Sequence, residues 1–286
     1  MKSKSFEGFM KIVFIICAAT SILAILLICY FIFSGGVPFI MEYGLKNFLF
    51  GNKWAPSHSP QAFGILPMIV GSLLVTLGAI IIGVPIGVLT ATYLAKFSNK
   101  KIYRFLKPSI NLMAGIPSIV YGFFALVVVV PVMRNLVGGT GMNIITASLL
   151  LGIMILPTII GLSESSIRSV PESYYEGSVG LGASHERAVM TVILPAAKSG
   201  IISSVILGIG RAIGETMAVI LVAGNEPRIP SSLTQGVRTL TTNIVLEMGY
   251  AAEAHREALI ATAVVLFVFI LLINGIFLII KRRAMN

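Results

Sequence analysis

Six long apolar stretches, separated by polar segments, dominate the pattern of hydrophobic and polar positions along the chain. A helix needs about 20 apolar residues to cross the hydrocarbon core of a bilayer, and each stretch meets that length. The first stretch is longer than the apolar region of a typical signal peptide, and no small-x-small cleavage site follows it. We therefore expect an all-α integral membrane protein with six transmembrane helices, at residues 11–33, 67–94, 109–133, 142–162, 197–223 and 258–280.

The composition agrees with a membrane protein. Of 286 residues, 56% are hydrophobic and 11% are charged, whereas about a quarter of a soluble domain is charged. Cys17 and Cys29 both lie in the first apolar stretch, so the chain has no disulfide framework. His58, His185 and His255 lie in different predicted loops and have no metal-binding spacing.

The distribution of basic residues predicts the orientation. The net charge is +10, but position matters more than the sum, because Lys and Arg concentrate in cytoplasmic loops. One side holds 14 of them, in the N-terminus, residues 96–107, residues 163–198 and Lys281-Arg282-Arg283. The other side holds six, so both termini are expected in the cytoplasm and nucleic-acid binding is not needed to explain the charge. The six are Lys46, Lys53, Arg134, Arg228, Arg238 and Arg256.

Two extracytoplasmic loops follow from this topology, at residues 34–63 and 224–257. The second carries apolar residues at helical spacing, which predicts an amphipathic helix on the outer surface or facing a partner. With no internal repeat or linker, residues 1–286 are expected to form a single transmembrane domain. The spaced apolar residues are Leu233, Val237, Leu240, Ile244 and Met248.

Proline and glycine recur within the predicted spans. They are expected to break backbone hydrogen bonds that lipid cannot satisfy, so these helices must pack against neighbours or line a cavity. Close helix packing and a moving, pore-lining bundle both remain open. The prolines are Pro67, Pro85, Pro117, Pro131 and Pro157.

The predicted cytoplasmic loop at residues 163–198 is longer than a simple connection requires. Ser169 and Glu172 have the spacing of a capping box, which predicts a short helix starting there. Gly180-Leu181-Gly182 should end it, and a second short helix can run from Ser184 to Ile193. The expected result is a helix-turn-helix that projects into the cytoplasm.

A charged pair lies inside the fifth predicted span. In a continuous helix, Arg211 and Glu215 are four residues apart and share a face. Charges at this depth are costly and normally face a polar interior. The guanidinium suits phosphate oxygens, so a place on an anion pathway and an ion pair tying two helices together both remain open. The neighbouring glycines are not a dinucleotide-binding fingerprint, since no strand precedes them.

The loop at 163–198 resembles the EAA loop of ABC importer permeases. Gly177 and Ser178 replace the two usual alanines, and Val192 replaces an isoleucine. The resemblance implies that the loop docks in a groove of a separate ATPase subunit, with Glu176 facing the ATPase and Gly182 making the sharp turn. The matching residues are Glu176, Gly177, Ser178, Gly182, Leu194 and Pro195.

Longer segments resemble the PstC-type permeases of phosphate importers. They are residues 63–95, Gly115 to Phe123 and, most specifically, Gly208 to Val219; Trp54-x-Pro56 favours this type over the PstA type. The resemblance implies a type I ABC importer permease fold in the bacterial cytoplasmic membrane, with Arg211, Glu215 and Thr216 on the phosphate pathway.

The same resemblance implies the partners. They are a PstA-like sister permease, two cytoplasmic ATPase subunits and an extracytoplasmic phosphate-binding protein. The chain itself is not expected to be an enzyme or to hold a cofactor, because it has no phosphate-cradling Gly-x-x-x-x-Gly-Lys-Ser/Thr sequence and no Asp to help hold Mg²⁺. ATP and Mg²⁺ would be bound by the ATPase.

Two other functions stay open at this point. One is an ABC permease for another oxyanion, such as sulfate or molybdate, because Arg211 alone does not distinguish these anions. The other is a proton-coupled secondary anion transporter in which Glu215 carries the proton. The long cytoplasmic loop favours the ABC class.

Overall fold

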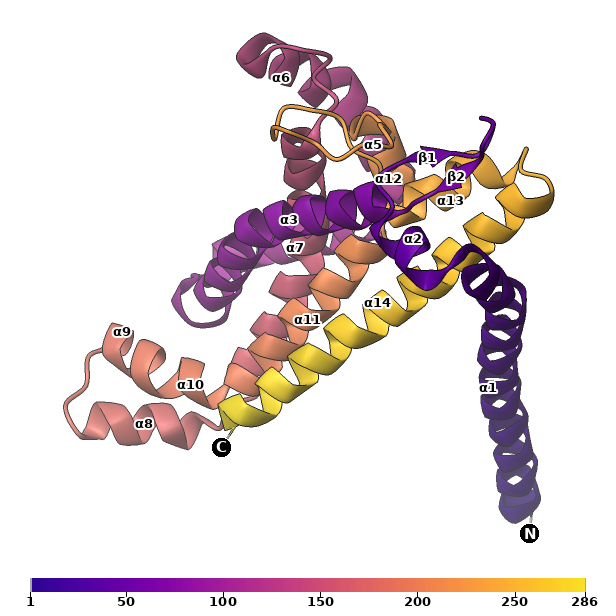
Figure 1. Cartoon of the computed structure of the whole chain (residues 1–286). Helices are drawn as coiled ribbons and strands as arrows, with labels where there is room; N and C mark the ends of the chain where they lie inside the picture. The colour runs from indigo at the N-terminus through magenta and orange to yellow at the C-terminus, as the bar shows by residue number, and fades with distance from the viewer. Residues whose placement is uncertain (1, 286) are drawn as a thin grey trace.

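The computed structural model describes residues 2–285 and is built almost entirely of helices (Figure 1). The side chains of Lys2, Lys4, Lys281 and Arg283, which contribute to the charge count, lie outside the described part. The helices are α1 (Lys2–Tyr43), α2 (Leu45–Phe50), α3 (Leu66–Thr92), α4 (Lys100–Gly115), α5 (Ser118–Phe124), α6 (Val130–Val137), α7 (Ile144–Arg168), α8 (Glu172–Gly180), α9 (His185–Ala188), α10 (Leu194–Ala196), α11 (Lys198–Gly214), α12 (Met217–Val222), α13 (Leu240–Met248) and α14 (Glu253–Met285). Three π-helical turns, η1 (Tyr93–Phe97), η2 (Ala125–Val129) and η3 (Val189–Ile193), and a hairpin of β1 (Trp54–Ala55) and β2 (Ala62–Phe63) complete the fold.

Five helical segments are long and apolar enough to cross a membrane. A sixth arises if the bent pair of His185–Ala196 and Lys198–Gly214, which meet at 68°, counts as one span. All six predicted spans thus have a counterpart, although several boundaries differ. The five segments are Phe6–Tyr43, Leu66–Phe97, Ser118–Val137, Ile144–Arg168 and Glu253–Ile279.

The third predicted span, 109–133, is wrong in its boundaries. The chain breaks at Ile116 and Pro117, both of which have extended backbone. Proline disfavours the helical conformation of the residue before it, so α4 ends at Gly115 and the span begins at Ser118. α4 is a separate amphipathic helix, started by Asn99, whose side chain accepts a hydrogen bond from Ile102 N at 2.8 Å.

The fifth predicted span, 197–223, is not continuous. α11 ends at Gly214, Glu215 has extended backbone (φ −69°, ψ 130°), and α12 starts at Met217. At 1.5 Å per residue, α11 spans only about 25 Å. The break separates the two residues of the predicted charged pair, Arg211 and Glu215.

The two predicted outer loops differ from expectation in opposite ways. The first contains more helix than predicted, and the predicted helix of the second is shorter. α1 continues past Pro38 to Tyr43, so the loop expected from residue 34 starts ten residues later, and α2 and the hairpin occupy the rest. In the second loop Leu240–Met248 is helical, started by a capping box at Thr239, and α14 already begins at Glu253. Leu233 and Val237 lie outside this helix, in irregular chain.

Glycines serve close packing between α3 and α7, which contact each other along most of their length. A Cβ added at Gly83 would lie 2.8 Å from Gly152 O, and one at Gly87 would lie 2.8 Å from Ile159 Cγ2. A Cβ at Gly208 of α11 would lie 2.9 Å from the same isoleucine. At these positions the packing explanation is confirmed, and the core lies where α3, α7 and α11 meet.

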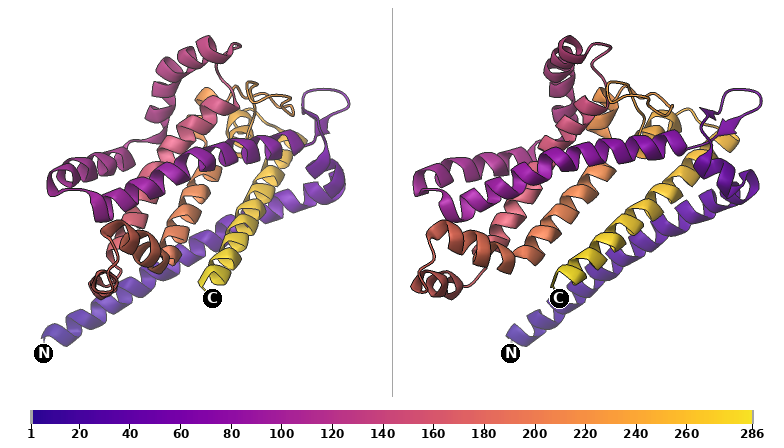
Figure 2. Two further views of the ribbon diagram at one scale, coloured as in Figure 1. Left: turned by 90° about the vertical axis from the view of Figure 1, so that its left-hand side faces the viewer. Right: turned by 60° about the vertical axis from the view of Figure 1, so that its left-hand side comes forward.

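The N-terminal helix differs from this core. α1 contacts α14 and the short α2, and it stands at the edge of the bundle (Figure 2). None of the side chains in its most apolar window is buried. It offers an apolar surface to lipid or to another subunit.

The helix-turn-helix at residues 163–198 is confirmed. α8 and α9 project away from the bundle (Figure 1), with Gly182 in the left-handed region at φ +90°. The capping box is wrong, because Pro171 is the N-cap residue and the Ser169 hydroxyl donates to Ser166 O. Ser184 caps the second helix by accepting from Arg187 N.

Candidate functional site

Arg211 lies in the last turn of α11 and faces a groove of about 720 Å³. Its Nη1 donates to Thr158 Oγ1 of α7 at 3.3 Å. None of the ion pairs among the described residues includes Arg211. Since a guanidinium has five N–H donors, most of its capacity is free for a ligand.

The groove is formed by α7, α11 and α14 and is rich in hydroxyl groups. Hydroxyls can donate to an anion without bringing a competing negative charge. A smaller cavity of about 200 Å³ between α3, α11 and α14 has an almost wholly apolar surface; Ser72 and Thr76 lie in its wall, but none of its lining residues is charged. The polar residues of the Arg211 groove are Thr158, Ser166, Ser203, Ser204, Arg211 and Asn274.

The predicted shared face of Arg211 and Glu215 is wrong, because the helix ends between them. Glu215 Oε1 instead accepts from Thr216 N and Ala218 N, both at 3.1 Å, at the start of α12. The Glu215 carbonyl accepts from Thr241 Oγ1 of α13 at 3.1 Å. These contacts hold the break in place.

Thr216 also belongs to the break. Its hydroxyl donates to Gly214 O at 3.3 Å, across the residue that separates the two helices. Arg211, Glu215 and Thr216 are therefore neighbours in space at one structural feature, but their side chains have different partners. The arrangement presents a cation in a groove beside a helix break, which is where an anion can be held.

The residues of the EAA-like loop are divided between its two helices and the turn. Glu176, Gly177 and Ser178 lie on α8, Gly182 lies in the turn, and Leu194 and Pro195 lie on α10. Glu176 is exposed. Beside it, apolar side chains are also exposed, up to 92% at Leu181, so the projecting surface mixes one carboxylate with apolar groups.

His185 ties this loop to η1, which directly follows α3, and the sequence alone did not reveal this contact. Its Nδ1 lies 2.9 Å from Tyr175 Oη and its Nε2 lies 3.1 Å from Lys96 O. Phe97 packs on the same ring at 5.0 Å between centroids. His185 thereby links Tyr175 of α8 to η1.

A buried ion-pair network around Glu164 was also missed. Glu164 is 1% exposed and pairs with Lys107 at 2.5 Å and with Arg168 at 2.8 Å. The Arg168 partner could have been found from its i, i+4 spacing on one helix. The Lys107 partner comes from α4, 57 positions away, and no pattern in the sequence indicates it.

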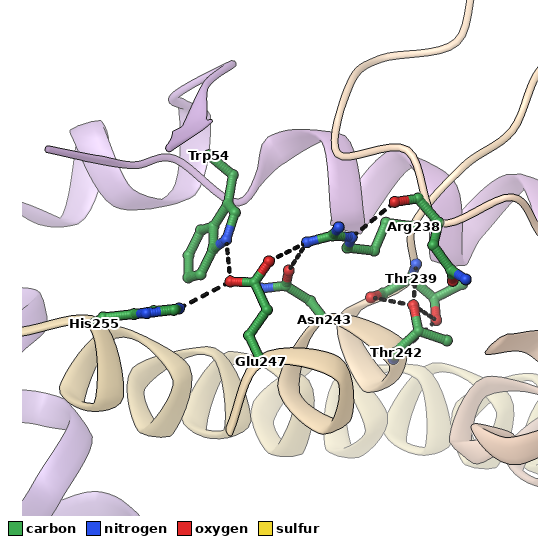
Figure 3. Close-up of polar contacts among 8 residues, drawn as sticks. Trp54, Arg238, Thr239, Thr242, Asn243, Glu247 and His255 are labelled. Carbon is green, nitrogen blue, oxygen red and sulfur yellow. Dashed lines mark hydrogen bonds and ion pairs between the residues drawn. The ribbon is translucent and has the colours of Figure 1, made fainter. Parts of the chain in front are cut away.

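A second network centres on Glu247 (Figure 3), in α13, which lies at the end of the bundle away from α8 and α9 (Figure 1). Trp54 Nε1 donates to Glu247 Oε2 at 2.8 Å, and His255 Nε2 lies 2.8 Å from the same oxygen. Arg238 donates to Glu247 Oε1 and, at 3.1 Å, to Asn243 Oδ1. The network joins the hairpin, the segment before α13, α13 itself and α14 into one cap.

The chain matches a family model described as "Binding-protein-dependent transport system inner membrane component" over residues 83–286. It is 36% identical over 267 residues to the probable ABC transporter permease protein YqgH of Bacillus subtilis, covering 90% of this chain and 86% of that protein. It is 32% identical over 266 residues to the phosphate transport system permease protein PstC of Mesorhizobium japonicum, covering 86% of this chain and 80% of that protein.

Solved structures show the same fold. The inward-facing MetNI methionine ABC transporter aligns with 77% of this chain and 94% of its own, at a TM-score of 0.57 and 23% identity. A bacterial alginate ABC transporter in complex with a periplasmic protein aligns with 92% and 91%, at a TM-score of 0.65 and 16% identity.

The likeness to these transporters confirms the type I ABC importer permease fold. The family match and the sequence relatives show that the chain is an integral membrane transport component, a permease subunit of an ABC importer. The chain belongs to the family of binding-protein-dependent transport system inner membrane components.

Proposed function

We propose that this permease imports inorganic phosphate. The observation that carries the proposal is Arg211, whose side chain has one neutral protein partner at 3.3 Å in a groove lined by hydroxyls. A guanidinium donates to two phosphate oxygens at once, and Thr158, whose hydroxyl oxygen accepts from Arg211, can donate its own hydrogen to the anion. The PstC relatives support phosphate as the transported anion.

The break after Gly214 gives Glu215 and Thr216 a supporting role on this pathway. Glu215 uses one carboxylate oxygen to hold the start of α12, which fixes the backbone next to Arg211. The Glu215 carboxylate therefore does not pair with the Arg211 guanidinium, whose donors stay available to the anion.

The proposed assembly pairs this chain with a PstA-like sister permease, two ATPase subunits that bind ATP and Mg²⁺, and an extracytoplasmic phosphate-binding protein. The exposed surface around Glu176 and Leu181 would dock in a groove of one ATPase. When the ATPases close, α8 would move, and its connection to α11 through α9 and α10 would carry the movement to Arg211.

The test is ATP-dependent uptake of labelled phosphate into proteoliposomes that hold the four kinds of subunit. We expect Arg211→Gln to lower uptake by about 100-fold or more, since a charged partner of the anion is lost. Arg228→Gln, which removes an exposed cation from the outer segment, should leave uptake unchanged. Normal uptake by Arg211→Gln, with assembly intact, would contradict the proposal.

The same assay separates phosphate from a second candidate cargo. A guanidinium among hydroxyls also fits sulfate or molybdate, so an excess of either unlabelled anion is added to the uptake mixture. Inhibition by phosphate alone supports the proposal, and stronger inhibition by sulfate or molybdate changes the cargo. Uptake driven by a pH gradient in vesicles that hold only this chain would indicate a secondary transporter instead.

A further inference from the structure

A second cavity lies at the end of the molecule that is predicted to be cytoplasmic. It has a volume of about 540 Å³ and lies where η1, the start of α4 and the end of α7 meet. Figure 2 shows the chain reversing direction there, between α3 and α4. Five of its ten lining side chains are cationic: Lys96, Lys100, Arg104, Lys107 and Arg168.

The wall of this basic pocket is fixed by a buried carboxylate. Glu164 lies behind it and holds both Lys107 and Arg168. Arg168 Nη2 also donates to Leu94 O at 2.8 Å, and its guanidinium carbon lies 4.6 Å from the centre of the Tyr103 ring. Two of the five cations are therefore held in place before any ligand arrives.

The pocket has more positive charge than the protein neutralises. Glu164 and Glu172 are the carboxylates paired with its side chains, and in the 3.6 Å Lys96–Glu172 pair the glutamate is exposed. In the described part of the chain, no carboxylate pairs with Lys100 or Arg104. Five cations against two carboxylates leave a surplus of three positive charges, which attracts an anion.

Exposed apolar side chains on α4 indicate which kind of anion binds in the basic pocket. Phe105 and Leu112 are 74% and 73% exposed, and their separation of seven residues places them on one face of the helix. A helix with exposed apolar side chains beside Lys and Arg lies in the membrane interface. Basic pockets beside spans on the cytoplasmic side bind the head groups of anionic lipids.

We propose that this pocket binds the phosphate group of an anionic phospholipid, with the acyl chains along Phe105 and Leu112. Lys100 and Arg104 supply the unpaired charges, and the Glu164 network supplies the rigid wall. The backbone of Lys96 at its rim is the partner of His185, so the bound lipid sits beside the anchor of the α8–α9 loop. The proposal does not depend on which ion is transported.

The test titrates phosphatidylglycerol into the purified full-length chain in detergent and resolves single binding events by native mass spectrometry. Removing two cations in Lys100→Gln with Arg104→Gln should weaken the tightest site by about 30-fold. Both side chains are exposed, so the variant should fold, which circular dichroism and size-exclusion chromatography check. The matched control, Lys46→Gln with Lys53→Gln, removes the same charge from the outer segments and should bind as the parent does.

Phosphatidylcholine and inorganic phosphate distinguish the source of the anion. We expect neither phosphatidylcholine nor free phosphate to displace phosphatidylglycerol from the site. Displacement by inorganic phosphate would show a site for a free anion and overturn the lipid assignment. Equal binding of phosphatidylglycerol by the parent and the double variant would show that the pocket holds no lipid.

Discussion

Arg238 and Arg211 carry the same guanidinium group, but the two groups differ in burial and in how many of their donors are used within the protein. Arg238 is 14% exposed and donates to Glu247, to Asn243 and to Asn225 O. Arg211 is exposed in its groove and donates to one threonine. A guanidinium whose donors are used within the protein fixes loops, whereas one with unused donors is available to a ligand. Mutations should therefore act on stability at Arg238 and on transport at Arg211.

The largest effect on stability is expected from Arg238→Ala. It leaves Glu247 largely buried without its cation, and breaking such a pair costs about 3–5 kcal/mol. The melting temperature in detergent should fall clearly, while Arg211→Gln, made in parallel, should melt close to the parent. An Arg238→Ala variant that melts normally would show that the two arginines do not differ in this way.

Trp54→Phe tests a smaller part of the same cap. The Phe ring keeps the packing against Phe63 but cannot donate to Glu247. A hydrogen bond to a charged group contributes about 2 kcal/mol, so the melting temperature should fall less than in Arg238→Ala. Phosphate uptake by the folded variant should be unchanged, and a loss of uptake at full stability would place the cap on the transport pathway.

Thr158→Val tests the single partner of Arg211 and should have the smallest effect. The substitution keeps the shape and removes the hydroxyl that orients the guanidinium. One neutral hydrogen bond contributes about 1 kcal/mol, so half-maximal uptake should need roughly five times more phosphate. Ser148→Ala, which removes a hydroxyl bonded to Val75 O elsewhere on α7, is the control and should leave that concentration unchanged.

The spans could be predicted from the sequence because hydropathy is averaged over some 20 residues, and a single proline or glycine changes it little. The helix-turn-helix was equally accessible, since Gly182 supplies the left-handed backbone of the turn. Both depend on local chemistry. The same reasoning located Arg211, because a cation within an apolar stretch stands out.

The break after Gly214 could not be predicted. A continuous helix satisfies the local pattern from Arg211 to Val219. Beside the local hydrogen bonds of the Glu215 carboxylate, the contacts that favour the break come from Thr241 of α13 and from the packing of α12 against α5. The Glu247 network could not be predicted for the same reason, because Trp54 lies 193 positions from its partner. Contacts between residues so distant in sequence are decided by the tertiary fold.

The unburied apolar surface of α1 has a consequence for how the protein is inserted into the membrane. The ribosome makes this helix before the spans that follow it in the sequence, and its apolar window contains no buried side chain. It can therefore leave the translocon for the bilayer alone. α7 differs, because its Glu164 pairs with Lys107 of α4 and its Ser148 bonds Val75 O of α3, both in helices made before it. Other polar side chains of α7 must wait for a later helix, since Ser163 bonds Ser204 of α11 at 2.5 Å.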